Sequence, residues 1–163
     1  MTRFWIAFIA AALGIMIGVD AQSATLCESI TPHSTISAKM ARDVCEEVRG
    51  FAKVHGVDEG LALSVSEAES NFRPWVISHA GAVGPMQIKP HYHCPVFLGV
   101  RVCKSRAQFS EAGVRHLAEL LERRTVRDAL RCYNAGIRGC REDDTGAGYA
   151  RRVSMIQQRL RRR

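Results

Sequence analysis

The chain has 163 residues, a length that favours a single domain, and it carries a formal net charge of +7 at pH 7. Only four of its 23 basic residues are lysine and 19 are arginine, a composition suited to an anionic partner. The arginines are dispersed and aromatic residues make up only 7% of the chain, which argues against nucleic-acid binding.

The beginning of the chain has the organisation of a secretory signal peptide. Arg3 precedes an unbroken apolar run from Phe4 to Val19, and small residues follow. We expect a signal peptide over residues 1–24, with cleavage after Ala21 or Ala24, and an exported, periplasmic domain over residues 25–163. The alternative is an uncleaved membrane anchor. After cleavage no membrane span is expected.

Six cysteines lie beyond this segment, and an even number in an exported chain indicates disulfide bonds. They are Cys27, Cys45, Cys94, Cys103, Cys132 and Cys140. Sequence alone does not select among the possible pairings. Short loops favour the local bridges Cys94–Cys103 and Cys132–Cys140, which leaves Cys27 to pair with Cys45.

Apolar spacing predicts four or five helices and no convincing strand. A stripe from Ile36 to Phe51 predicts a first helix that ends near Gly56. Asp58 is expected to cap a second helix, which must stop by Pro74.

Residues 73–108 are expected to be irregular, because four of the five prolines lie there. Ser110 is expected to cap a further helix, and Thr125 another that runs to Tyr133 and stops at Gly136. A last helix carries Tyr149 to Leu160 on one face and ends in arginines, which we expect to be solvated. The predicted fold is a compact, mainly α domain stapled by disulfides.

The second predicted helix contains two glutamates, Glu67 and Glu69, that are candidates for a functional carboxylate. At about 100° per residue, Glu69 falls within the apolar arc formed by residues such as Leu61 and Val65. Glu67 falls on the far side and is expected to be an ordinary solvated glutamate. A carboxylate on a buried face must be paired, protonated or directed into a cleft. Glu69 is therefore either a buried ion-pair partner of an arginine or a catalytic group.

The segment after this helix favours catalysis. Gly81 and Gly84 permit tight turns and close approach of the backbone. Met86 and Gln87 offer an apolar wall beside a neutral hydrogen-bonding group, and Ser78 could donate a hydrogen bond to the carboxyl group of Glu69.

Four motifs, in order, resemble those of the soluble lytic transglycosylase family, whose members have a lysozyme-like, goose-type fold. They are the sequences Glu69–Phe72, Ser78–Pro90, Tyr133–Gly136 and Tyr149–Val153. The similarity covers about residues 38–156, nearly all of the expected mature chain. Pro85 departs from the family, which usually has leucine there, and so does an insertion rich in His and Cys after Pro90.

The resemblance implies that Glu69 is the single catalytic acid and base and that Ser78 orients it. It also implies that Met86 and Gln87 line a sugar groove, faced from later helices by Tyr133 and Asn134, with Tyr149 adding to the substrate site. The implied reaction cleaves the bond between N-acetylmuramic acid and N-acetylglucosamine in peptidoglycan. It forms a 1,6-anhydro ring and needs no cofactor.

Several alternatives remain open at this point. His91, His93, Cys94 and Cys103, with His79 nearby, could be read as a zinc site, but their spacing matches no standard ligand set. A hydrolytic lysozyme of the same fold and a non-catalytic wall-binding protein are the other candidates. Small members of the family often open the wall for secretion, conjugation or appendage systems, and others serve in turnover.

Overall fold

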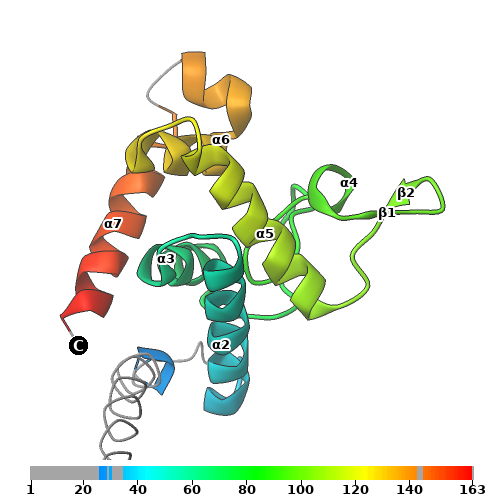
Figure 1. Cartoon of the computed structure of the whole chain (residues 1–163). Coiled ribbons are helices and arrows are strands. Elements are labelled where there is room, and N and C mark those ends of the chain that lie inside the picture. The colour runs from blue at the N-terminus through cyan, green and yellow to red at the C-terminus, as the bar shows by residue number, and fades with distance from the viewer. Residues whose placement is uncertain (1–25, 29, 31–34, 143–144, 163) are drawn as a thin grey trace, which may run out of the picture.

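The computed structural model describes residues 26–28, 30, 35–142 and 145–162 (Figure 1). Its main elements are α2 (Ala38–Val54), α3 (Glu59–Ser70), α4 (Pro90–His93), β1 (Val96–Phe97), β2 (Val100–Arg101), α5 (Arg106–Leu121), α6 (Val126–Glu142) and α7 (Ala147–Arg161). The expected signal peptide and its cleavage sites lie outside the described residues. Within the described ranges, every helix is too short or too polar to cross a bilayer.

Helix α3 lies at the centre of the domain, packed between α2 and α7 (Figure 1). Asp58 caps it as predicted, because its carboxylate accepts a hydrogen bond from the backbone N–H of Leu61 at 2.8 Å. Six consecutive residues, Leu61 to Ser66, are buried, so neighbours surround the first half of the helix. A helix fixed in this way holds its last turn, which carries Glu69, in a defined place.

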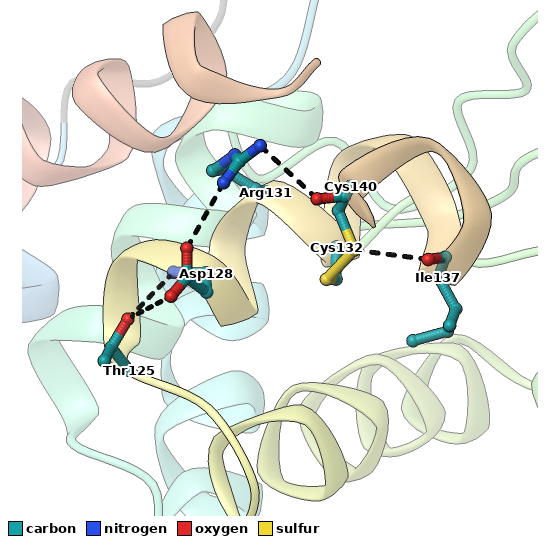
Figure 2. The surroundings of a disulfide bond; sticks show 6 residues. All are labelled: Thr125, Asp128, Arg131, Cys132, Ile137 and Cys140. Carbon is teal, nitrogen blue, oxygen red and sulfur yellow. Dashed lines mark hydrogen bonds and ion pairs between the residues drawn. A yellow bond between two sulfur atoms is a disulfide. The ribbon is translucent and has the colours of Figure 1, made fainter. Parts of the chain in front are cut away.

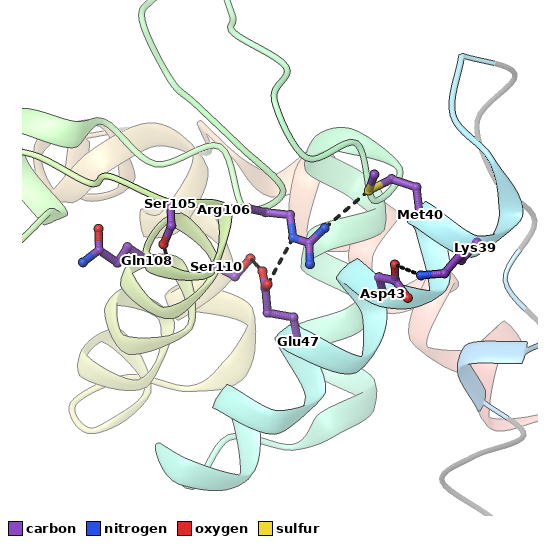
Figure 3. Close-up of polar contacts among 8 residues, drawn as sticks. All are labelled: Lys39, Met40, Asp43, Glu47, Ser105, Arg106, Gln108 and Ser110. Carbon is purple, nitrogen blue, oxygen red and sulfur yellow. Dashed lines mark hydrogen bonds and ion pairs between the residues drawn. The ribbon is translucent and has the colours of Figure 1, made fainter.

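Helices α2 and α5 are joined by polar contacts around Glu47 (Figure 3). Its carboxylate accepts a hydrogen bond from the Ser110 hydroxyl at 2.6 Å and from the Arg106 side chain at 3.1 Å. The prediction that Ser110 caps this helix was wrong. Ser105 is the N-cap, and its hydroxyl accepts a hydrogen bond from the N–H of Gln108 at 3.3 Å. Ser110 lies one turn inside the helix, where it satisfies a partly buried carboxylate.

Helix α6 consists of two helical pieces separated at Gly136, whose φ of 72° and ψ of 166° are not helical. Thr125 accepts a hydrogen bond from the N–H of Asp128 at 3.3 Å, as expected of an N-cap. The bridge Cys132–Cys140 crosses the break, and Arg131 connects Asp128 to the carbonyl of Cys140 (Figure 2). Gly136 therefore ends the first piece as predicted, but a second helical piece follows it.

All three predicted disulfide pairings are confirmed: Cys27–Cys45, Cys94–Cys103 and Cys132–Cys140. The expectation of an irregular segment over residues 73–108 was only partly right. It contains the short helix α4 and an antiparallel hairpin in which Val96 pairs with Arg101 and Phe97 with Val100. Strands of two residues show no periodicity that a sequence pattern could reveal.

Helix α7 returns along α3 (Figure 1). The arginines at its end are exposed to solvent, as expected, and two of them also meet carboxylates: Arg159 pairs with Glu67, and Arg161 lies 3.8 Å from the carboxylate of Asp58. Glu67 is accordingly not an ordinary solvated glutamate, since its side chain is only 17% exposed. Arg159 therefore links the end of α7 to α3.

Candidate active site

Glu69 lies in the last turn of α3, and its carboxyl group is largely withdrawn from solvent. Burial raises the pKa of this group above its ordinary value, whereas the Tyr149 hydroxyl and the positive charge of Arg152 act to lower it. Burial is the largest of these effects, so Glu69 keeps its proton to a higher pH than an ordinary glutamate does. Such a group can act as a proton donor.

Tyr149 and Arg152 approach Glu69 from α7. Burial, followed by the nearby Glu69 charge, raises the pKa of Tyr149 well above its ordinary value, so the phenol stays neutral. Its buried hydroxyl lies close enough to affect Glu69 but makes no hydrogen bond of standard geometry with any described residue. Arg152 donates a hydrogen bond to the carbonyl of Ala68 at 2.7 Å, which ties α7 to the residue before Glu69.

The turn that carries Met86 and Gln87 is tethered directly to α3. The hydroxyl groups of Ser66 and Ser70 both donate hydrogen bonds to the carbonyl of Pro85, at 3.3 Å and 2.8 Å. Both serines are almost completely buried, so water does not compete for these contacts. The tether holds the turn against the end of the helix that carries Glu69.

Strained backbone conformations gather at the same place. Asn71, Phe72 and Gln87 have φ angles of 51°, 60° and 47°, in the left-handed region that residues other than glycine seldom occupy. Asn71 is the left-handed C-cap of α3, a conformation that asparagine tolerates. Phe72 and Gln87 each cost on the order of 1–3 kcal/mol and persist only where their surroundings enforce the conformation. Two of the three end α3 just after Glu69, and the third lies in the turn that faces it. This clustering is typical of a functional site.

Gln87 and Ser78 form hydrogen bonds within the loop. The Gln87 amide nitrogen donates to the carbonyls of Val76 and Gly84 at 2.9 Å and 3.0 Å. The Ser78 hydroxyl accepts a hydrogen bond from the N–H of Ala82 at 3.0 Å. The structure thus gives Ser78 a role in its own turn, and its orientation of Glu69 stays a prediction.

Tyr133 joins this turn from α6. Its hydroxyl donates a hydrogen bond to the carbonyl of Met86 at 2.7 Å. Burial raises the pKa of Tyr133 well above its ordinary value, and the charge of Glu69 adds to the effect, which places Tyr133 within the electrostatic reach of Glu69. The Met86 side chain is completely buried. The expectation that it lines an open groove must therefore be corrected: Met86 supports the turn from behind.

Gly113 of α5 allows this close packing. A Cβ atom built on Gly113 would lie 2.2 Å from the Cβ of Met86 and 3.2 Å from the Tyr133 hydroxyl. Contacts below 3.0 Å do not occur between real Cβ atoms, so any side chain here must displace the turn. The absence of a side chain is what brings α5, the turn and Tyr133 together.

We expect Gly113→Ala to lower the free energy of unfolding by about 1–3 kcal/mol, because overpacking outweighs the better helix propensity of alanine. Urea denaturation would measure the change. Gly50→Ala in α2 is the matched control: a Cβ atom added to Gly50 would have no neighbouring atom within 4 Å, so alanine should be neutral or stabilising there. Equal effects of the two substitutions would contradict the packing argument.

A row of rings extends from Tyr133 through His116 to His93. The ring of His116 lies 5.4 Å from that of Tyr133 and 4.1 Å from that of His93, between centroids. The alternative of a zinc site loses Cys94 and Cys103, which form a disulfide. Among the described residues, no group of three His, Cys, Asp or Glu side chains is arranged to hold a metal ion.

The structure brings together three of the residues that the sequence predicts for the site. Glu69, Tyr133 and Tyr149 approach one another from three helices. Gln87 forms hydrogen bonds within its own loop and Asn134 is exposed on α6, so the contacts of these two residues with substrate stay predictions. Sequence reasoning missed four supporting residues: Ser66, Ser70, Gly113 and Arg152. Ser66 and Ser70 recur at i and i+4 and so lie on one side of α3, a signal that could have marked them. Gly113 and Arg152 act through tertiary contacts and left no such signal.

Comparison with known proteins agrees with this geometry. Residues 47–150 match the model of the transglycosylase SLT domain, a range that contains every candidate site residue. The membrane-bound lytic murein transglycosylases C of Haemophilus influenzae (strain PittEE) and Actinobacillus succinogenes are each 43% identical over 51 residues, or 31% of this chain. That of Klebsiella pneumoniae subsp. pneumoniae is 42% identical over 53 residues, or 32% of this chain.

The matched segment spans only 14–15% of the length of these relatives, so their similarity is confined to one part of a larger protein. The match to the family model is much broader, since it covers more than half of the chain and includes the candidate site residues from Glu69 to Tyr149. The fold, the position of Glu69 and this match lead to one conclusion: the chain belongs to the transglycosylase SLT domain family.

Proposed function

We propose that the chain is a peptidoglycan lytic transglycosylase that uses Glu69 as its single general acid and base. The observation that carries this proposal is the environment of Glu69: a largely buried carboxyl group of raised pKa, beside Tyr149 and opposite a tethered turn. A proton donor of this kind is what cleavage of a glycosidic bond requires.

The reaction begins with protonated Glu69, which donates its proton to the oxygen between N-acetylmuramic acid and N-acetylglucosamine. The bond from the anomeric carbon to that oxygen breaks, and the substrate's N-acetyl group stabilises the positive charge. The Glu69 carboxylate then accepts the proton of the muramic acid 6-hydroxyl, whose oxygen bonds to the anomeric carbon. Glu69 regains its proton, and the product is a 1,6-anhydro sugar formed without consumption of water.

The other carboxylates of this helix support a one-carboxylate mechanism. Two-carboxylate glycosidases hold these groups about 5–9.5 Å apart. Asp58 and Glu59 lie at the opposite end of α3, eleven and ten residues from Glu69, which corresponds to about 15–16 Å along the helix axis. Glu67 is engaged by Arg159.

We further propose that the protein acts in the periplasm. The three disulfides support an oxidising compartment. Its task there would be local opening of the wall for an envelope-spanning system, or wall turnover.

Mass analysis of muropeptides released from purified sacculi tests the reaction. We expect products that end in 1,6-anhydro-muramic acid. Products with a free reducing end would identify a hydrolytic lysozyme and contradict the proposed chemistry. Binding to sacculi without release would indicate a non-catalytic wall-binding protein and contradict the enzymatic assignment.

A further inference from the structure

The hairpin between α4 and α5 is a stiff projection from the domain (Figure 1). The disulfide Cys94–Cys103 closes its base, and both cysteines are buried. Arg101 donates a hydrogen bond to the carbonyl of Cys94 at 3.0 Å, and the N–H of Val102 bonds to the carbonyl of Pro95 at the same distance. The hairpin can therefore present a fixed surface.

That surface is apolar on both faces. The exposed fractions are 58% for Val96, 51% for Phe97, 88% for Leu98 and 65% for Val100, and we call these four residues the hairpin tip. Strands at a surface usually alternate between apolar and polar side chains, and this hairpin does not. Four neighbouring apolar side chains gain nothing from exposure to water, so folding alone does not account for them.

The turn at the hairpin tip also exposes an apolar side chain. Leu98 and Gly99 have φ angles of 49° and 79°, as in the tight hairpin turn whose first position favours asparagine, aspartate or glycine. Leucine is strained there and its side chain is almost fully exposed. An asparagine would relieve the strain and suit the solvent. Leucine at this position therefore exposes an apolar side chain at a cost in stability.

Two positively charged side chains lie at the base of the hairpin. Between Glu69 and Glu111 the sequence has no acidic residue but has five Lys and Arg residues. Two of them are exposed on or next to the hairpin: Arg101 in β2, and Lys104, whose ammonium lies 3.3 Å from the centre of the Phe97 ring. Apolar side chains at a tip with cations at its base suit an interface that is apolar inside and anionic at its surface.

We propose that the hairpin tip docks on an anionic phospholipid membrane. Phe97, Leu98 and the two valines enter the boundary between headgroups and acyl chains, while Arg101 and Lys104 contact the phosphates. Peptidoglycan is hydrophilic and offers no apolar layer for Leu98. A protein interface commonly buries about 800 Å² on each partner, more than four side chains on a narrow hairpin supply.

Added tryptophans provide a local test. Leu98→Trp and Val54→Trp place one reporter at the hairpin tip and one at the end of α2, where Val54 is 75% exposed. Each full-length variant is mixed with vesicles of brominated phosphatidylcholine, with or without phosphatidylglycerol, and quenching is compared with that of the parent chain. Because all three proteins contain residues 4–19, membrane binding by that apolar run cancels in the comparison.

We expect quenching at position 98 to exceed that at position 54 by about threefold or more, only in vesicles with phosphatidylglycerol, and to fall as salt is raised. Exchange of Arg101 and Lys104 for glutamine should weaken it. Equal quenching at both positions, or equal quenching in neutral vesicles, would overturn the proposal and leave a protein or glycan partner. Leu98→Ser should release muropeptides from isolated sacculi as the parent does, since no membrane is present, so failure of docking and failure of catalysis are distinguishable.

Discussion

Replacement of Glu69 by glutamine is expected to lower the rate of muropeptide release by a factor of roughly 10²–10⁴, the usual contribution of a general acid or base. Glutamine has nearly the same shape but neither donates nor accepts the required proton. Because burial raises the pKa of Glu69, the folded state disfavours the charged carboxylate. The stability that this group contributes is lost as pH rises through its folded pKa. At neutral pH the variant should therefore melt at the same temperature as the parent chain, or at a higher one.

Glu67→Gln is the matched control, because it makes the same chemical change two residues earlier in the same helix. Glu67 lies on the side of α3 that meets α7, where it pairs with the partly exposed Arg159. Its loss should cost about 1 kcal/mol of stability at most and should leave muropeptide release intact. Full activity of Glu69→Gln, or equal loss in both variants, would contradict the assignment of Glu69. Binding of Glu69→Gln to sacculi separates loss of chemistry from loss of the substrate site.

The two glutamates also show what helical periodicity can predict about a side chain and what it cannot. Periodicity within α3 assigned Glu69 and Glu67 to different sides of the helix, but it wrongly predicted that Glu67 would be solvated. It could not reveal that Arg159, 92 residues later, reaches Glu67. The pattern records which way a side chain points, whereas its partner depends on how α7 packs against α3.

The disulfides could be predicted from the sequence, whereas the hairpin could not. Cysteines separated by 8 or 9 residues have few other partners within reach, so their pairing could be predicted from spacing. The hairpin between Cys94 and Cys103 has strands of two residues and a leucine in a position that favours asparagine or glycine, so it lacked a recognisable turn signal. The role of Gly113 could not be predicted from the sequence either, because it depends on a tertiary contact. A Cβ atom on Gly113 would lie 2.2 Å from the Cβ of Met86.

Between pH 6.5 and pH 4 the domain is expected to lose about 3 kcal/mol of stability through His116 alone. The side chain is 19% exposed and lies between the rings of His93 and Tyr133. Burial, together with the positive charges of His93, Arg115 and Arg124, lowers the pKa of His116 from 6.5 to about 4. The carboxylate of Glu119, 3.8 Å from Nδ1, acts in the opposite direction but is 60% exposed and well solvated.

The direction of the effect follows from the two pKa values. Between them the unfolded chain binds a proton on His116 and the folded chain does not, so stability rises with pH across this range and falls on acidification. His93 adds to the trend, because burial and neighbouring charges lower its pKa as well. Free energies of unfolding from urea titrations at pH 7, 5.5 and 4 would measure the slope.

His116→Phe keeps an aromatic ring beside Tyr133 but removes the proton, so its stability should vary less with pH than that of the parent chain. His79→Phe alters an exposed histidine on the loop and should follow the parent. An unchanged slope in His116→Phe would refute the assignment of the pH dependence to His116.

The result also bears on activity. Acidification keeps Glu69 protonated as the donor, but it weakens the packing of His116 against Tyr133, whose hydroxyl donates a hydrogen bond to the carbonyl of Met86. If muropeptide release by the parent falls at low pH and release by His116→Phe does not, then loss of packing around His116, and not protonation of Glu69, limits the release at low pH.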